Sequence, residues 1–121
     1  MGKCILTADD SISVRQVLKY VLEGAGYSVV DAVDGKDALA KLGGKTVDLI
    51  VTDLHMPNLD GLGLIKAVRA SPAHRFIPCL MVTTESHEDV KQAGRAAGAT
   101  GWIVKPFAPD QLLAVVKKLI G

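Results

Sequence analysis

The chain has 121 residues, of which 49% are hydrophobic and 22% charged, a composition typical of a folded globular domain and not of a disordered segment. Its formal net charge of +1 provides no electrostatic attraction to nucleic acid, and no apolar run approaches the roughly 20 residues that span a bilayer. We therefore expect one cytoplasmic domain over residues 1–121 whose partners are neither nucleic acid nor a membrane.

Short apolar runs rich in β-branched residues alternate along the chain with segments of helical periodicity. The runs predicted to be strands are 3–8, 28–32, 47–52, 79–83 and 101–104. Strands joined by helices pair in parallel through right-handed crossovers, and strands that are apolar almost throughout are covered on both faces. The pattern therefore predicts an α/β fold with a doubly wound, five-stranded parallel sheet.

Helices are predicted between and after these strands, at about 14–25, 35–42, 62–70, 88–97 and 109–120. Gly26 follows the first helix as a C-terminal cap, and Pro109 begins the last, where a missing N–H costs nothing. The fourth helix has Val90 as its only large apolar residue and Gly94 in its interior. We expect this helix to be marginally stable and mobile.

Ionic and hydroxyl side chains stand at the ends of four of the predicted strands. Asp9 and Asp10 follow the first strand, Asp53 the third and Lys105 the fifth, while Thr83 ends the fourth. Because the carboxyl ends of parallel strands meet at one edge of a sheet, these groups are expected to converge in the crevice where such folds bind ligands. Each feature alone has an ordinary interpretation, since acids cap helices and threonine favours strands. Their joint placement indicates a functional site.

The chemistry of these groups favours a magnesium-dependent reaction of phosphate. Carboxylates within about 4 Å of one another repel, so Asp9, Asp10 and Asp53 call for a proton or a cation. Oxygen-only ligands in a wet crevice favour Mg²⁺, which completes its coordination with water and phosphate oxygens. With the ion present, Asp53 can act as a nucleophile toward phosphorus. Lys105 supplies a point cation and Thr83 a hydroxyl donor for phosphoryl oxygens.

The cysteines and histidines do not form a metal-binding pattern. Cys4 and Cys79 lie inside apolar runs, without a Cys-x-x-Cys spacing, and are interpreted as small core residues. His55, His74 and His87 are scattered along the chain, which argues against a dedicated zinc site.

Four stretches of the chain resemble a known protein family. They are 8–11 (Ala-Asp-Asp-Ser), 52–61 (Thr-Asp-Leu-His-Met-Pro-Asn-Leu-Asp-Gly), 81–85 (Met-Val-Thr-Thr-Glu) and 102–107 (Trp-Ile-Val-Lys-Pro-Phe). Together they resemble the receiver domain of two-component response regulators, and within it the stand-alone chemotaxis type, the CheY-like proteins. The resemblance implies a flavodoxin-like fold with the strand order 2-1-3-4-5. In that order the third strand separates the strands of Cys4 and Cys79 by roughly 10 Å, which is beyond the reach of a disulfide.

The resemblance also implies a role for each acidic residue. Asp53 would accept a phosphoryl group from the phosphohistidine of a sensor histidine kinase. Asp10, Asp53 and the backbone carbonyl of His55 would ligate Mg²⁺, while Asp9 would act largely through water.

Further roles concern the response to phosphorylation. Thr83 and Lys105 would bind the new phosphoryl oxygens, and Trp102 occupies the position of a switching Tyr or Phe that turns inward when Thr83 is drawn to the phosphoryl group. Trp102 is bulkier than those rings and carries a polar N–H, which argues against the same rotation, and a half-exposed aromatic on an edge strand is the other interpretation. His55 and Glu85, on opposite sides of the expected path of a hydrolytic water, either set the lifetime of the phosphorylated state or are ordinary loop residues.

The protein is accordingly expected to be a switch that promotes only its own phosphorylation and dephosphorylation, and not an enzyme acting on metabolites. Its output would be a changed surface over 88–97, 101–104 and 109–120, presented to a downstream target such as a flagellar switch component. A phosphatase is a further possible partner, and the chain is expected to be a monomer or a weak dimer through the same surface.

Other classes remain as alternatives at this point. Within the family, the alternative function is a phosphorelay shuttle or a phosphate sink. A haloacid-dehalogenase-like phosphatase would need an acid where His55 stands, and a flavodoxin would not place Asp9 and Asp10 in its phosphate loop.

Overall fold

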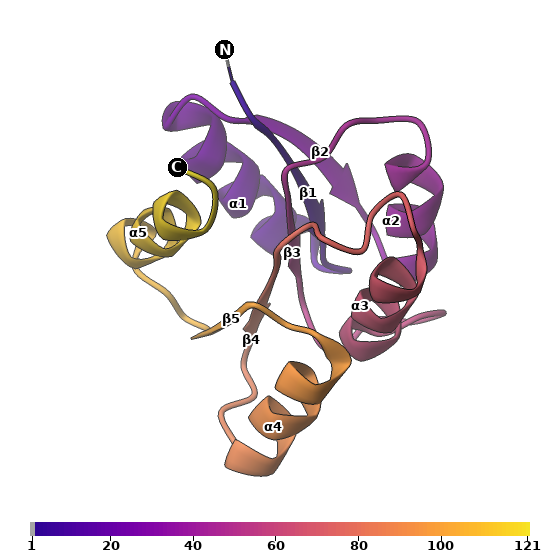
Figure 1. Ribbon diagram of the computed structural model, residues 1–121. Helices are drawn as coiled ribbons and strands as arrows, with labels where there is room; N and C mark the ends of the chain where they lie inside the picture. Colours follow the sequence, from indigo (N-terminus) through magenta and orange to yellow (C-terminus); the bar gives the residue numbers. More distant parts are fainter. Residues whose placement is uncertain (1) are drawn as a thin grey trace.

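The computed structural model describes residues 2–121 and contains one five-stranded parallel sheet with helices on both faces (Figure 1). The strands are β1 (Cys4–Ala8), β2 (Ser28–Ala32), β3 (Leu49–Thr52), β4 (Cys79–Thr83) and β5 (Gly101–Val104). The helices are α1 (Ile12–Gly24), α2 (Gly35–Leu42), α3 (Gly61–Ala70), α4 (Glu88–Ala97) and α5 (Pro109–Ile120). The strand order is β2-β1-β3-β4-β5, and every neighbouring pair is parallel. The predicted doubly wound fold and its strand order are confirmed.

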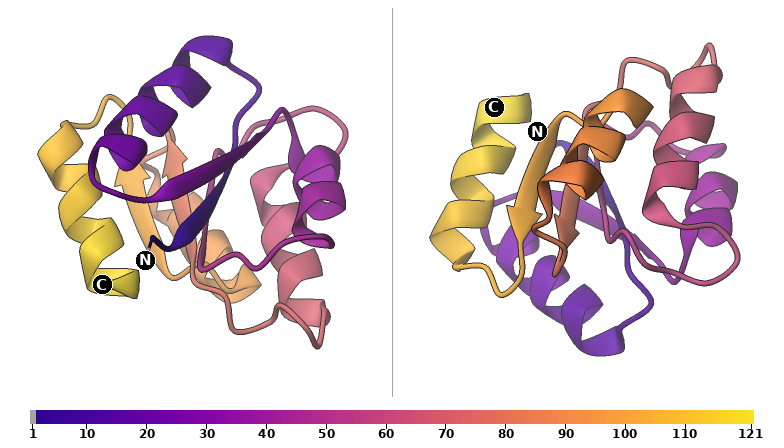
Figure 2. Two further views of the ribbon diagram at one scale, coloured as in Figure 1. Left: turned by 90° about the horizontal axis from the view of Figure 1, so that it is seen from above. Right: turned by 90° about the horizontal axis from the view of Figure 1, so that it is seen from below.

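Two apolar layers lie on either side of the sheet. Helices α1 and α5 cover one face, and α2, α3 and α4 cover the other (Figure 2). Successive side chains of a strand point to opposite faces, so the neighbouring residues Ile5 and Leu6 of β1 enter different layers, and both are fully buried. This double coverage explains why the strands read as almost continuous apolar runs in the sequence.

Helix α1 begins two residues before its predicted start because a side chain caps it. The hydroxyl oxygen of Ser11 accepts a hydrogen bond from the N–H of Val14 at 3.3 Å. At the other end, Gly26 has a φ of 98° and donates its N–H to the carbonyl of Glu23 at 3.0 Å. Gly26 therefore ends the helix in the left-handed region, as predicted.

The remaining boundaries differ from the prediction by two residues or fewer. Helices α2, α4 and α5 begin and end at the predicted residues. Helix α3 begins at Gly61, one residue early, because the carboxylate of Asp60 accepts the N–H of Gly63 at 2.7 Å. Strands β1 and β3 begin later than predicted, at Cys4 and Leu49. The β1–β3 register starts at Leu49, although the N–H of Asp48 already donates to the carbonyl of Cys4 at 2.8 Å.

Helix α4 buries little apolar surface, as its sequence predicted. Its buried residues are Gly94 and Ala97. His87 stands at its N-cap without a capping side-chain hydrogen bond, whereas Gly98, with a φ of 112°, closes its C-terminus. The expected mobility of α4 stays a prediction. None of the helices within residues 2–121 is long and apolar enough to cross a membrane.

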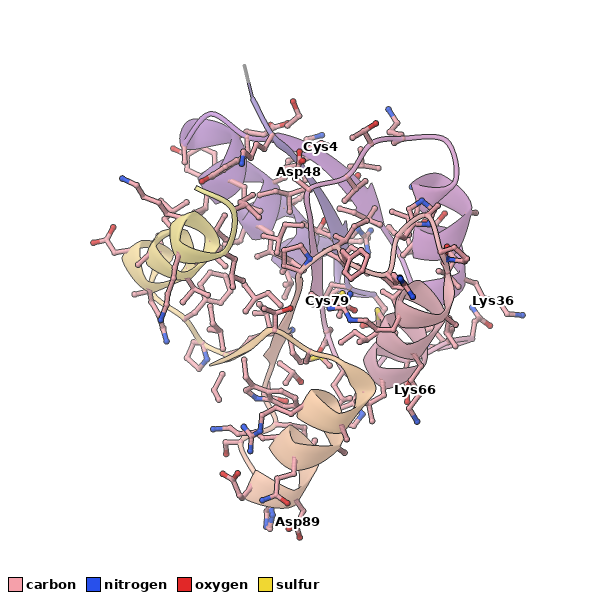
Figure 3. The ribbon with its side chains drawn as sticks, viewed as in Figure 1. Cys4, Lys36, Asp48, Lys66, Cys79 and Asp89 are labelled. Atoms are coloured by element: carbon pink, nitrogen blue, oxygen red, sulfur yellow. The ribbon has the colours of Figure 1, made fainter. Side chains whose placement is uncertain are left out.

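The two cysteines differ in environment, and both thiols are free. Cys79 is fully buried, as predicted, and burial raises its pKa to about 11 despite the nearby positive charge of Arg69. Cys4 is a correction, because it is only partly buried at the edge of the core. It lies beside Asp48 (Figure 3), whose carboxylate accepts the backbone N–H of Cys4 at 2.8 Å. Burial and then the charge of Asp48 raise the pKa of the Cys4 thiol.

Candidate functional site

The order and register of the strands bring the predicted site residues to one edge of the sheet. Asp9 and Asp53 leave the adjacent strands β1 and β3 at the same level, because the residues before them are register partners. Lys105 leaves β5 beside the end of β4, and its backbone N–H donates to the carbonyl of Thr83 at 2.8 Å. The peptide bond between Lys105 and Pro106 is cis.

Three carboxylates meet at this edge. Asp9, Asp10 and Asp53 each offer an oxygen, and these atoms lie within 4.8 Å of one another. Asp9 is buried, and one of its oxygens accepts the backbone N–H of Ser11 at 2.9 Å. Asp53 is partly buried, and one of its oxygens accepts the N–H of Leu54 at 2.7 Å. Asp10 is exposed, so the cluster opens to solvent on its side.

Lys105 lies between two of these carboxylates. Its Nζ donates to Asp9 at 3.0 Å and to Asp53 at 3.3 Å. Burial by itself lowers the pKa of Lys105, but the hydrogen bond and charge of Asp9, followed by those of Asp53, outweigh burial and raise it. The group is therefore a stable ammonium ion. With three carboxylates and one ammonium, the pocket keeps two formal negative charges.

The donor set fits a hard divalent cation. Carboxylate oxygens are the ligands that Mg²⁺ prefers, and the exposed side of the cluster leaves room for the waters that this ion retains. The residual negative charge attracts a cation to the cluster. Asp9, Asp10 and Asp53 are thus able to hold the ion, while the backbone carbonyl of His55 as a further ligand stays a prediction.

His55 and Glu85 meet across the mouth of the pocket. Their atoms Nε2 and Oε2 are 3.0 Å apart, and both side chains are at least one-third exposed. His55 belongs to the loop between β3 and α3, which also carries Asp53, and Glu85 to the loop between β4 and α4, so the contact joins these two loops. The sequence placed these residues on opposite sides of the site but gave no signal that they touch.

Trp102 packs against helix α4. Its indole N–H donates to the backbone carbonyl of Glu85 at 2.9 Å. A Cβ at Gly94 of α4 would lie 2.5 Å from a ring carbon of Trp102, so the glycine leaves the space that the ring occupies. Trp102 is partly buried on the edge strand β5. Thr83 is fully buried, and its hydroxyl oxygen accepts the N–H of Glu85 at 3.4 Å, so Glu85 contacts both residues.

A pair of residues that the sequence did not single out holds the loop after Asp53. The side-chain amide of Asn58 donates to Asp34 at 2.6 Å, and Asn58 has a φ of 69°. Asp34 also caps α2 through the N–H of Asp37 at 2.8 Å. The N–H of Asp37 and then the amide of Asn58 lower the pKa of Asp34. Asp34 before a helix is recognisable as a cap, but its contact with Asn58 depends on the folded loops.

An apolar groove of about 350 Å³ adjoins the acidic pocket. It lies between α1 and the segment after β5, and its apolar walls include Val14, Val17, Phe107 and Pro109. Lys105 lines it as well, which connects the groove to the carboxylates. A partner seated in the groove would lie next to Asp53.

Known proteins are similar to this chain in sequence and in fold. The model of the response regulator receiver domain matches residues 5–117. Chemotaxis protein CheY of Pseudomonas aeruginosa is 36% identical over 116 residues, which cover 95% of this chain and 94% of that protein. The alkaline phosphatase synthesis transcriptional regulatory protein PhoP of Bacillus subtilis is 39% identical over 99% of this chain, which spans 49% of its length.

Solved structures agree with this assignment. The chemotaxis protein CheY4 of Vibrio cholerae superimposes with a TM-score of 0.94 at 44% identity, covering 98% of this chain and 99% of that one. The match of the family model and the two nearly full-length relatives point to the same conclusion: the chain belongs to the response regulator receiver domain family.

Proposed function

We propose that the chain is a phosphorylation-activated switch whose phosphoacceptor is Asp53. Receiver domains belong to two-component signalling, in which a histidine kinase is the phosphodonor and the acidic pocket binds Mg²⁺. The observation that carries the proposal is the meeting of Asp9, Asp10 and Asp53 around the ammonium of Lys105. These groups supply a nucleophile, a cation site and a fixed positive charge for a phosphoryl group.

In the proposed reaction, a carboxylate oxygen of Asp53 attacks the phosphorus of a phosphohistidine. An O–P bond forms as the N–P bond breaks, and the leaving imidazole nitrogen takes up a proton from water. Mg²⁺ bound at the carboxylates would offset the negative charges of the acceptor and the phosphoryl group. Lys105 already donates to Asp53 and can transfer that hydrogen bond to a phosphoryl oxygen. The hydroxyl of Thr83, at the end of β4, is the further donor.

The switch is proposed to run from Thr83 through Glu85 to Trp102. When the Thr83 hydroxyl turns to a phosphoryl oxygen, the N–H of Glu85 loses its acceptor. The carbonyl of the same residue holds the indole N–H of Trp102, whose ring lies against Gly94 of α4. A shift of Glu85 would therefore move the ring and α4 together. The surface of α4, β5 and α5 is the proposed output of the switch.

The contact between His55 and Glu85 is proposed to set the lifetime of the phosphorylated state. It joins the loop that carries Asp53 to the loop that follows Thr83, and we propose that it lies beside the path of the hydrolytic water. An exposed pair of this kind contributes little to stability and opens readily. Replacing His55 by alanine should change the rate of phosphoryl loss without unfolding the protein. An unchanged decay rate would show that the contact has no role in the lifetime.

The partners follow from the same proposal. A sensor histidine kinase is the donor, and the groove of Val17 and Phe107 beside the pocket offers apolar surface for its approach. The nearly full-length similarity to CheY of P. aeruginosa favours a chemotaxis target such as a flagellar switch component, with a phosphatase as a further partner. Altered swimming bias in a deletion strain, without a change in transcription, would support this target. Unaltered swimming would favour a phosphorelay shuttle or a phosphate sink.

Intact-mass measurement tests the phosphoacceptor. The unaltered chain, given acetyl phosphate and Mg²⁺, should gain one phosphoryl group, and Asp53→Asn should gain none. Asp60→Asn is the matched control, because Asp60 is an exposed carboxylate on the same loop that only caps α3. Equal labelling of the unaltered chain and Asp53→Asn, or loss of labelling in Asp60→Asn alone, would contradict the assignment.

A further inference from the structure

Arg15 reaches from the first turns of α1 to the backbone between the two acids that follow β1. Side chains of a helix lean toward its N-terminus, so the guanidinium extends back past the start of α1 at Ile12. Its Nη1 donates to the backbone carbonyl of Asp9 at 2.7 Å. Its Nε lies 3.4 Å from a carboxylate oxygen of Asp31 on β2, and the side chain is 13% exposed.

This placement needs a compensating interaction. A positive charge near a helix N-terminus opposes the helix dipole, and burying a guanidinium removes it from water. Within Ile12–Gly24, no acidic residue lies in the first turn to offset that charge. The carbonyl of Asp9 accepts one N–H of the guanidinium, and the carboxylate of Asp31 offsets its charge.

The contact acts on the peptide unit that links Asp9 to Asp10. A peptide unit is planar, so a hydrogen bond to the Asp9 carbonyl fixes the plane from which the next residue projects. The Asp9 carboxylate has other fixed partners, in Ser11 and Lys105. The Asp10 side chain is exposed, so its direction depends on the backbone that carries it.

We propose that Arg15 is a positioning residue for the magnesium site, which holds the Asp9–Asp10 peptide so that the Asp10 carboxylate faces Asp53. The inference rests on the proposed function, because it requires these carboxylates to bind the ion. A positioning role and a purely electrostatic role of Arg15 predict opposite changes in Mg²⁺ affinity when its charge is removed. The guanidinium repels a divalent cation, so if only its charge mattered, removing that charge would tighten Mg²⁺ binding.

Mg²⁺ affinity measured by calorimetry separates these effects. Arg15→Lys keeps the charge but loses the planar fork, and Arg15→Gln loses the charge. If Arg15 positions the site, both should bind Mg²⁺ about 10-fold more weakly, the loss usual for outer-shell partners of metal ligands. Lys19→Gln, an exposed residue one turn further along α1, is the matched charge control and should bind Mg²⁺ as tightly as the unaltered chain or more tightly.

Asp31→Asn tests whether the effect arises through general loss of structure. It weakens the link from Arg15 to β2 but leaves the donation to the Asp9 carbonyl, so Mg²⁺ affinity should be retained. Unfolding by urea in the absence of Mg²⁺ shows which variants are folded. If neither Arg15 variant folds, the Nη1–H resonance of Arg15 in the unaltered chain, the group that donates to the Asp9 carbonyl, is followed during Mg²⁺ titration, and it should shift with the binding curve.

Three results would overturn the inference about Arg15. Mg²⁺ binding by Arg15→Gln that equals or exceeds that of the unaltered chain overturns the inference, as does weakening by Asp31→Asn to the level of Arg15→Lys. An Arg15 Nη1–H signal that does not change at saturating Mg²⁺ also overturns it. Failure of the unaltered chain to bind Mg²⁺ would instead reject the proposed magnesium site, and the inference with it.

Discussion

Replacing Asp10 by asparagine should have opposite effects on stability in the absence and presence of Mg²⁺. Without the ion, Asp10 is a third carboxylate within 4.8 Å of Asp9 and Asp53, and Lys105 donates to the other two. Removing its charge relieves repulsion and should stabilise the folded state. With the ion, the same carboxylate is a ligand, and its loss should remove the stabilisation that binding provides.

The two effects of Asp10→Asn on the free energy of unfolding are of similar size. Two unit charges at the 4.8 Å limit of the cluster interact by about 1 kcal/mol in water and by about 3 kcal/mol at an effective dielectric of 20. Asp10 is exposed, so the lower figure applies, and Asp10→Asn should raise the free energy of unfolding by about 1 kcal/mol without Mg²⁺. At ten times its dissociation constant, a ligand adds about 1.4 kcal/mol to the native state. The order of stability should therefore reverse when Mg²⁺ is added.

Urea unfolding followed by Trp102 fluorescence measures both states, once with EDTA and once with Mg²⁺ at ten times the dissociation constant found by calorimetry. Asp89→Asn is the control, because Asp89 is an exposed carboxylate of α4 outside the cluster (Figure 3), and its effect should not depend on Mg²⁺. The reasoning is refuted if Asp10→Asn is less stable than the unaltered chain in EDTA. Equal stabilisation of both proteins by Mg²⁺ would refute the ligand role.

Three further changes test the packing and the burial. Gly94→Ala puts a methyl group 2.5 Å from the Trp102 ring, so it should cost about 1–3 kcal/mol and shift the emission spectrum, and an unchanged spectrum would contradict the packing. Burial raises the pKa of Cys79 from 9.0 to about 11, so stability present below pH 9 is lost as pH rises to 11. This loss, on the order of 2 kcal/mol, should be missing from urea unfolding of Cys79→Ala. Thr7→Val should raise the free energy of unfolding by about 1 kcal/mol, because the buried Thr7 hydroxyl has no hydrogen-bond partner among residues 2–121, and no gain would mean that it is satisfied.

The helices and strands were predictable because their signals are local, whereas the strand order came from the resemblance to receiver domains. A strand such as β4 is a short apolar run between turn residues, and a helix such as α2 begins after a capping aspartate and ends at a glycine pair. The convergence of Asp9, Asp53 and Lys105 followed from these elements, since parallel strands place their carboxyl ends at one edge. No side-chain detail was needed for that step.

Contacts between side chains of different loops were not predictable in the same way. His55 and Glu85 are 30 residues apart and touch only because β3 and β4 are neighbours with a defined register. The donation from Arg15 to the Asp9 carbonyl depends on where α1 starts, which the apolar pattern placed two residues too late. Periodicity reports which face of an element is buried, but it carries no information on which polar atoms meet beyond that face.

For Trp102, the sequence left two interpretations open, and its packing against α4 shows how the ring is placed. The sequence allowed either an inward-turning switch residue or a half-exposed aromatic on an edge strand. In the structure, the ring is partly buried against α4 and fits there only because Gly94 has no side chain. The glycine that weakens α4 as an isolated helix is thus what allows the helix to pack on the aromatic ring. Gly94 thus contributes both to the low stability expected of α4 and to its observed contact with the ring.

The charge balance of the pocket explains why phosphorylation would be felt at Thr83 and Lys105. Three carboxylates, one ammonium and a bound divalent ion are formally neutral together. Phosphorylation replaces the single charge of the Asp53 carboxylate by up to two charges on the phosphoryl group, so the pocket becomes anionic again. Lys105 can keep its bond to Asp9 at 3.0 Å and pass its bond with Asp53 to a phosphoryl oxygen, and the hydroxyl of Thr83 would be the second donor. Because that hydroxyl now accepts the N–H of Glu85, the proposed switch would transmit the added charge to the loop that holds Trp102.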